Sequence, residues 1–256
     1  MPYVNSQGVR IHYEVEGGGP PLVLQHGGVS SIEARRRCGY VQVLQHHYQC
    51  ILLDARGRGA SGKPHDPAAY ALQCHVADVV AVLDALHIRT AHFWGYSLGG
   101  WIAFGMAKYA PERVQKLVIG GAHLYEDRSF AAFRQVDGTD PDAFIAALEV
   151  VLEEPVPPQY RPLLLANDLQ ALAAAMQVPR PSLEEVLPTM TMPSLLYVGE
   201  ADSRYAAVKA CSTHIPNVTV VSLPGLNHAQ GMAQSGVVLP HVTKFLAAVH
   251  QERVSG

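Results

Sequence analysis

The chain has few of the features that mark several large protein classes. It contains only four cysteines, none in a C-x-x-C pair: Cys38, Cys50, Cys74 and Cys211. This scarcity gives no support for a metal centre or a redox pair, so we expect free thiols that are at least partly buried. No apolar run approaches the roughly 18 residues that a membrane-spanning helix needs. The N-terminal segment also lacks a signal-peptide pattern, which predicts a cytoplasmic protein without a membrane partner.

Charge is sparse as well. Asp, Glu, Lys and Arg make up 16% of the 256 residues, and the formal net charge is −3. Such a chain presents no broad positive field, so neither nucleic acid nor anionic lipid is an expected partner. The one basic cluster, Arg35-Arg36-Arg37, is predicted to be a solvated helix face. Hydrophobic residues reach 48%, enough for the core of one large domain.

Apolar patterns alternate between the periods of strands and helices. Short apolar runs predict strands at residues 9–15, 22–26, 49–54, 90–94, 116–120, 194–198 and 218–223. Helical periodicity predicts helices at residues 69–87, 101–109, 205–214 and 237–250. The polar–apolar alternation of residues 9–15 is typical of the edge strand of a hairpin. Strands alternating with helices predict an α/β fold whose mostly parallel sheet is covered on both faces.

Residues 122–188 interrupt this alternation, because they contain no convincing strand. Two helices are predicted there, at 142–153 and 162–177, and Asp140-Pro141 is a suitable helix start. We therefore expect a core domain made of residues 1–121 and 189–256, with a small helical cap formed by residues 122–188.

The pentapeptide Gly95-Tyr96-Ser97-Leu98-Gly99 lies between the predicted strand at 90–94 and the helix at 101–109. G-x-S-x-G at a sharp strand-to-helix turn is a nucleophile elbow, in which the flanking glycines leave room for the backbone. A serine hydroxyl is a weak nucleophile. Catalysis therefore also requires a base, an acid that orients it, and donors for an oxyanion.

With these motifs, the chain resembles serine hydrolases of the α/β-hydrolase fold over essentially its full length. The resemblance implies an eight-stranded type of sheet and a triad in the order nucleophile, acid, histidine. Gly199-Glu200-Ala201-Asp202 is similar to the acid loop of the family, and Asp202 is the expected acid. His228, in the loop after the last predicted strand, is the expected base. Glu200 is the nearest rival to Asp202, and Glu126 and Asp127 would serve in a rearranged triad.

The expected oxyanion donors are two backbone amides. One is the N–H of Leu98, which follows the nucleophile. The resemblance of His26-Gly27-Gly28 to the family's H-G-x motif implies that Gly28 supplies the other, while the His26 ring braces the loop. The glycine-rich segment 54–62 resembles a structural loop of the family and lacks the pattern of a phosphate-binding loop.

A serine triad predicts transfer of an acyl group to water. The preferred prediction is a carboxylesterase acting on small to medium, uncharged esters, with no cofactor or metal. Alternatives are a lactone hydrolase similar to 3-oxoadipate enol-lactonases, a C–C bond hydrolase or perhydrolase and, more remotely, a non-catalytic ligand receptor. No charged anchor for a substrate stands out, and the oligomeric state stays open. The predicted pocket residues are Tyr96, Leu124, Phe144 and Leu148.

Overall fold

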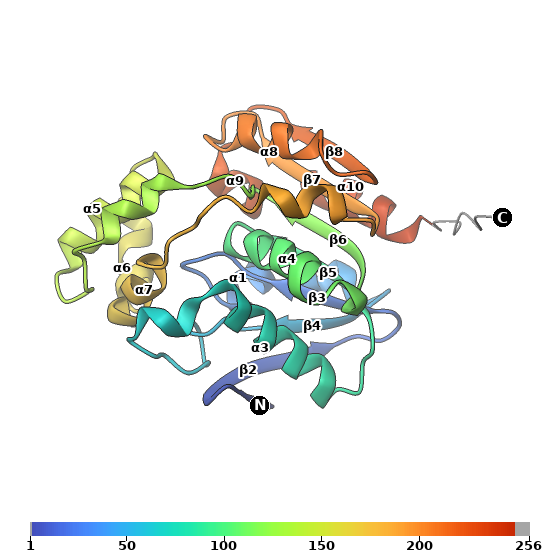
Figure 1. Cartoon of the computed structure of the whole chain (residues 1–256), viewed down its shortest axis with the longest axis horizontal. Coiled ribbons are helices and arrows are strands. Elements are labelled where there is room, and N and C mark those ends of the chain that lie inside the picture. The colour runs from blue at the N-terminus through green and yellow to red at the C-terminus, as the bar shows by residue number, and fades with distance from the viewer. Residues whose placement is uncertain (1, 249–256) are drawn as a thin grey trace.

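The computed structural model describes residues 2–248, and one sheet of eight strands forms its centre (Figure 1). In spatial order the strands are β1 (Tyr3–Ser6), β2 (Val9–Glu16), β4 (Gln49–Leu53), β3 (Pro21–Gln25), β5 (Ala91–Tyr96), β6 (Val114–Gly120), β7 (Ser194–Gly199) and β8 (Val218–Leu223). Strand β2 is antiparallel to β1 and β4, and the remaining pairs are parallel. The mostly parallel sheet is therefore confirmed. The four-residue β1, which is too short for a periodic signal, takes the edge position predicted for residues 9–15.

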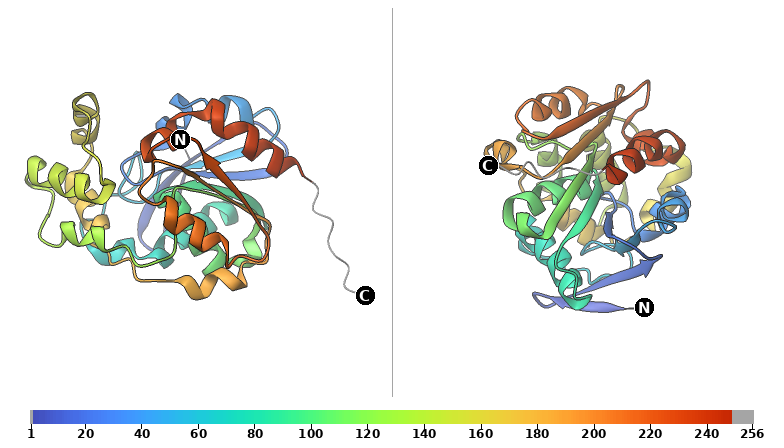
Figure 2. Two further views of the ribbon diagram at one scale, coloured as in Figure 1. Left: turned by 90° about the horizontal axis from the view of Figure 1, so that it is seen from above. Right: turned by 90° about the vertical axis from the view of Figure 1, so that its right-hand side faces the viewer.

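Helices cover both faces of this sheet (Figure 2). One face packs against α3 (Leu72–Ala85), α4 (Leu98–Tyr109) and α8 (Tyr205–Ser212). The other packs against α1 (Ile32–Arg37), α2 (Tyr40–Leu44) and α10 (Ser235–Ala247). Because successive strand residues point to opposite faces, Phe93 and Trp94 enter different cores. Short α9 (His228–Ala233) precedes α10, and residues 249–250 of the predicted last helix lie outside the described residues.

A helical cap lies to one side of the sheet, formed by α5 (Pro141–Leu152), α6 (Arg161–Leu165) and α7 (Leu169–Met176) (Figures 1 and 2). It has its own apolar core, which runs from Phe130 to Met176. The predicted helix start at Asp140 is confirmed, because its side chain accepts the N–H groups of residues 142 and 143. The single helix predicted at 162–177 is wrong. Asp168 caps a new helix by accepting the N–H of residue 171, so the segment divides into α6 and α7.

The basic cluster of α1 is a solvated face only at Arg37, which is exposed. Arg35 is only 2% exposed, because α1 packs on the sheet. Its guanidinium donates to the carbonyl of Gln25 at 2.9 Å and lies 5.2 Å from the ring of Trp94. Arg36 is partly buried and pairs with Glu14, Glu16 and Glu33. The three consecutive arginines are therefore buried at Arg35, partly buried at Arg36 and exposed at Arg37.

The cysteines match their prediction: two are buried, two are half-buried, and all four are free. Among the described residues, no helix is both long enough and apolar enough for a membrane crossing.

Candidate active site

Ser97 lies in a strained turn between β5 and α4. Its φ of 55° and ψ of −112° are rare for a residue with a side chain. The turn is held because the Ser97 N–H donates to the carbonyl of Gly120 at 2.8 Å, while the Ser97 carbonyl accepts the N–H of Trp101 at 2.9 Å. The flanking glycines are required by close approaches. A Cβ at Gly95 would lie 1.9 Å from the carbonyl oxygen of Gly99, and one at Gly99 would lie 2.4 Å from that of Gln25.

Asp202 and His228 meet across two loops that follow β7 and β8. The Nδ1 of His228 lies 2.7 Å from the Oδ2 of Asp202, and both side chains are buried. Burial by itself raises the pKa of Asp202. The hydrogen bond and charge of His228, together with Arg204, outweigh that effect and lower the pKa below its usual value. The carboxylate thus stays ionised and accepts the Nδ1–H, which leaves Nε2 of His228 free to accept a proton.

The rival acids lie elsewhere. Glu200 is exposed, and exposed Glu126 pairs with Arg128 on the surface. Asp127 lines the same cavity as Ser97, but its Oδ1 accepts the N–H and hydroxyl of Ser129. Of the four carboxylates weighed from the sequence, Asp202 is thus the one bonded to His228.

Tyr96 also contacts His228. Its hydroxyl donates to the backbone carbonyl of His228 at 2.6 Å, and the two ring centroids are 5.1 Å apart. The ring is buried and also contributes to the cavity wall. Sequence analysis placed Tyr96 in the pocket; it did not identify this contact with His228.

The loop after β3 brings the free amide of Gly28 close to that of Leu98, beside Ser97. A Cβ on Gly27 would lie 3.7 Å from the Ser97 Cβ, and one on Gly28 would lie 3.9 Å from the Leu98 Cβ. Neither the Gly28 nor the Leu98 N–H has an acceptor among residues 2–248. Two adjacent unused donors beside a serine form the kind of site that binds a developing oxyanion.

His26 braces this loop instead of facing the cavity. Its Nδ1 lies 2.8 Å from the Gly27 carbonyl, and its Nε2 accepts the N–H of Ala55 at 3.0 Å. Burial lowers the pKa of His26 to about 4, although neighbouring Asp54 opposes the shift. The neutral ring therefore donates from Nδ1 and accepts at Nε2, which links the loop after β3 to the loop after β4.

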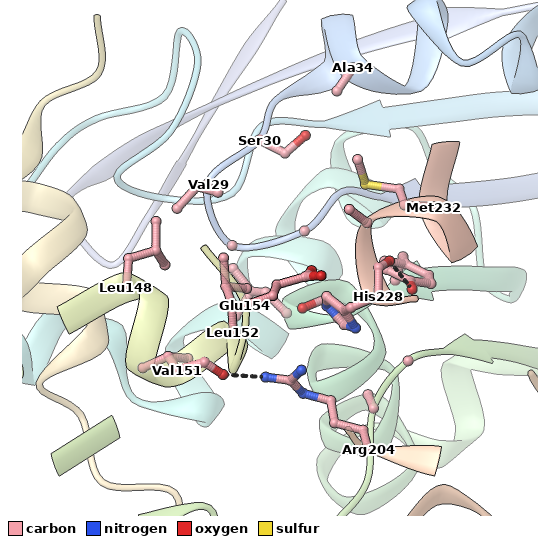
Figure 3. Close-up of a pocket in the computed structure, with 18 of the residues that line it drawn as sticks. Val29, Ser30, Ala34, Leu148, Val151, Leu152, Glu154, Arg204, His228 and Met232 are labelled. Carbon is pink, nitrogen blue, oxygen red and sulfur yellow. Dashed lines mark hydrogen bonds between the residues drawn. The ribbon is translucent and has the colours of Figure 1, made fainter. Parts of the chain in front are cut away.

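A cavity of about 880 Å³ separates the cap from the edge of the sheet that bears Ser97 and His228. Leu148, Leu152 and Glu154 of the cap face His228 and Arg204 of the core across it (Figure 3). Of the predicted lining residues, Tyr96, Leu124 and Leu148 contribute to the wall. Phe144 does not: it is fully buried in the core of the cap, with its ring 5.2 Å from that of Phe133.

Three arginines of the described chain line the cavity, and the sequence-based prediction named none of them as wall residues: Arg37 of α1, Arg180 and Arg204. Arg180 follows α7, and Arg204 follows Asp202 by two residues. Neither belongs to a motif, and only the folded chain shows that both reach the cavity. Arg128 and Arg134, which also belong to the cap segment, are both exposed and do not line it. Among residues 2–248, no group of three or more His, Cys, Asp and Glu side chains is arranged to hold a metal ion.

Comparison with known proteins gives one family. The family model for the α/β-hydrolase fold matches residues 20–158, more than half of the chain. A curated relative, the putative carbamate hydrolase RutD of Azorhizobium caulinodans, is 30% identical over 160 residues. That match covers 60% of this chain and 59% of the relative, so the chain spans about three fifths of that protein.

Solved structures match over almost the whole chain. A hydrolase from Pseudomonas aeruginosa is 26% identical, with a TM-score of 0.82 and coverage of 96% of this chain and 98% of the other. Est816, described as an N-acyl homoserine lactone degrading enzyme, is 25% identical, with a TM-score of 0.79 and coverage of 95% and 100%. The family match and these structures agree on a hydrolase fold but not on one substrate.

Proposed function

Since the chain belongs to the α/β-hydrolase fold family, we propose that it is a serine hydrolase that cleaves carboxylic esters, with Ser97 as nucleophile, His228 as base and Asp202 as orienting acid. The observation that carries the proposal is the 2.7 Å contact between buried Asp202 and His228, which lines a cavity together with Ser97 and two residues whose amides are free. The curated relatives of this chain include epoxide hydrolase 4 of Mus musculus. The elbow here holds a serine, whereas the epoxide hydrolases of this fold use a carboxylate at that position.

The reaction follows from these positions. The Ser97 Oγ attacks the carbonyl carbon of the ester and passes its proton to Nε2 of His228. The carbonyl oxygen becomes an oxyanion that accepts hydrogen bonds from the Gly28 and Leu98 N–H groups. When the tetrahedral intermediate collapses, the alcohol leaves with the proton from His228, and the acyl group stays on Ser97. Water then attacks the acyl-enzyme and gives its proton to His228. Collapse releases the acid and returns the proton to Ser97.

The test is labelling by a fluorophosphonate probe together with turnover of a panel of p-nitrophenyl esters. Wild-type protein is expected to be labelled once and to hydrolyse short and medium esters. Ser97→Ala abolishes both properties. Ser129→Ala is a matched control, because that hydroxyl is occupied by Asp127 outside the triad. Equal labelling of the wild type and Ser97→Ala would exclude the assignment of the nucleophile.

A second candidate, lactone hydrolysis, is favoured by the likeness to Est816. The same steps apply to a lactone, except that the leaving alcohol remains attached to the acyl group. Parallel kcat/KM values for p-nitrophenyl esters and for γ-butyrolactones would separate the two candidates, and a lactone value far above every ester value would establish the lactonase.

A further inference from the structure

Arg180 lies where the return segment of the cap meets the core. Its backbone carbonyl accepts the N–H of Asp127 at 3.1 Å, which joins the two segments that connect cap and core. The guanidinium carbon lies 4.6 Å from the ring centroid of Trp101 and 3.9 Å from that of Phe130. Trp101 is on the first turn of α4, the helix that begins directly after Ser97. Two aromatic rings therefore hold the guanidinium in the wall of the cavity that contains Ser97.

This cation has no paired anion in the described part of the chain. No carboxylate there lies within 4 Å of its nitrogens, and its N–H groups make no hydrogen bond. The nearby acids are engaged elsewhere: Asp127 accepts from Ser129, and Glu154 accepts from Asn227. Burial lowers the pKa of Arg180 to about 9, while Asp127 opposes that shift and Arg204 adds to it. Arg180 is half-buried and lines the cavity, so its unpaired guanidinium is available to an arriving anion.

A second arginine increases the positive potential of the same cavity. Arg204 donates through Nη2 to the Val151 carbonyl at 2.9 Å (Figure 3). Its Nη1 is buried, 3.6 Å from Asp202, and has no hydrogen-bond partner. Arg180 and Arg204 thus leave unused donors in a cavity that also includes exposed Arg37 and whose other side chains are mostly apolar.

We propose that Arg180 binds a carboxylate of the substrate, so that the enzyme acts on acidic esters or lactones whose carboxylate is remote from the scissile bond. The inference rests on the proposed serine hydrolase function and names its substrate class. The planar guanidinium offers parallel N–H donors that match the two oxygens of a carboxylate, and ring contacts fix its orientation before binding. The proposal replaces the uncharged substrate that the sequence predicted, because that prediction depended on finding no charged anchor.

Two substrate pairs test the proposal, each an acid and its neutral methyl ester. One pair carries the extra carboxyl in the acyl part: mono-p-nitrophenyl adipate and its methyl ester. The other carries it in the alcohol part: 4-acetoxybenzoate and methyl 4-acetoxybenzoate. The measured quantity is the ratio of kcat/KM for acid over ester. We expect a ratio above one in at least one pair, and Arg180→Met is expected to lower that ratio by about 10- to 100-fold.

The variants are chosen to separate charge from packing. Met keeps a flexible apolar chain against Trp101 and Phe130, and Arg180→Lys keeps the charge without the paired donors, so its ratio should be intermediate. Arg128→Met, at an exposed arginine outside the cavity, should leave the ratio unchanged. A wild-type ratio at or below one in both pairs overturns the proposal even if Arg180→Met does not fold.

Binding of adipate to Ser97→Ala protein, measured by calorimetry, separates this proposal from the proposed function. Adipate binding that is lost in the Ser97→Ala, Arg180→Met double variant supports the anchor, even if no ester is hydrolysed. Ester hydrolysis that depends on Ser97, with equal adipate binding in both variants, leaves the hydrolase in place and refutes the anchor.

Discussion

The substitution Gly99→Ala tests the coupling between the nucleophile elbow and the proposed oxyanion loop. The added Cβ would lie 2.4 Å from the Gln25 carbonyl oxygen and 3.0 Å from that of His26, whereas real Cβ contacts essentially never fall below 3.0 Å. The Gln25 carbonyl at the end of β3 must therefore move by at least about 0.6 Å, which is the difference between 2.4 Å and the 3.0 Å floor for Cβ contacts. Gln25 and His26 lead directly into Gly28, so the displacement reaches the proposed donor.

Two magnitudes follow. A shift of this size takes an N–H···O distance beyond the favourable range of about 2.7–3.2 Å. Complete loss of one oxyanion donor costs about 10²- to 10³-fold in kcat, so partial loss predicts a fall of about 10- to 100-fold. Overpacking also costs about 1–3 kcal/mol of stability, which exceeds the gain of up to about 1 kcal/mol that alanine offers over glycine in a helix.

The assay is kcat with a p-nitrophenyl ester, together with urea unfolding of the same protein. Gly236→Ala in α10 is the matched control, because nothing lies within 4 Å of its added Cβ. That variant should keep its kcat and should gain rather than lose stability. The reasoning would be refuted if Gly99→Ala retained kcat within about threefold of the wild type while showing unchanged stability.

Three further predictions concern the groups around the triad. Tyr96→Phe removes the hydrogen bond to the His228 carbonyl. It should lower the unfolding free energy by about 1 kcal/mol, measured by urea unfolding, and it should lower kcat for ester hydrolysis. Asp202→Asn should lower kcat by at least about 10²-fold, because the amide can donate to Nδ1 and favour the wrong tautomer of His228, and a kcat near that of the wild type would contradict the role of Asp202. Acid should destabilise the fold between about pH 6.5 and pH 4, because burial lowers the pKa of both His26 and His92 to about 4 while the unfolded chain keeps the ordinary value. The unfolding free energy then falls by at most about 1.4 kcal/mol per pH unit for each histidine. His26→Gln should reduce this pH dependence, measured by urea unfolding from pH 7 to pH 5.

The sequence predicted the core of the fold because strand and helix periods alternate clearly there. The positions proposed for the triad came from the elbow motif and the resemblance to the α/β-hydrolase family. Ser97 directly follows β5, whereas Asp202 and His228 lie in the loops after β7 and β8, and parallel strands bring such positions to one edge. Strand β1 was missed, because four residues are too few to show a period.

The cavity wall was harder to predict than the triad. Phe144 and Leu148 are four residues apart on α5, yet only Leu148 lines the cavity. Helical periodicity identifies an apolar face but does not distinguish the part that faces the core of the cap from the part that faces a ligand. Arg180 and Arg204 lie outside any periodic pattern, and their positions depend on how the cap packs against the core.

The end of α5 has a consequence for how the protein loses activity. Arg204 of the acid loop bonds to the Val151 carbonyl, and Asn227, adjacent to His228, bonds to Glu154 at 2.9 Å. One short stretch of the cap is thereby joined to the loops that carry Asp202 and His228. Local opening of the cap breaks both connections at once, while the sheet and its helices keep their own cores. Heat inactivation should therefore precede global unfolding, and cooling should restore turnover without any need for the sheet to refold.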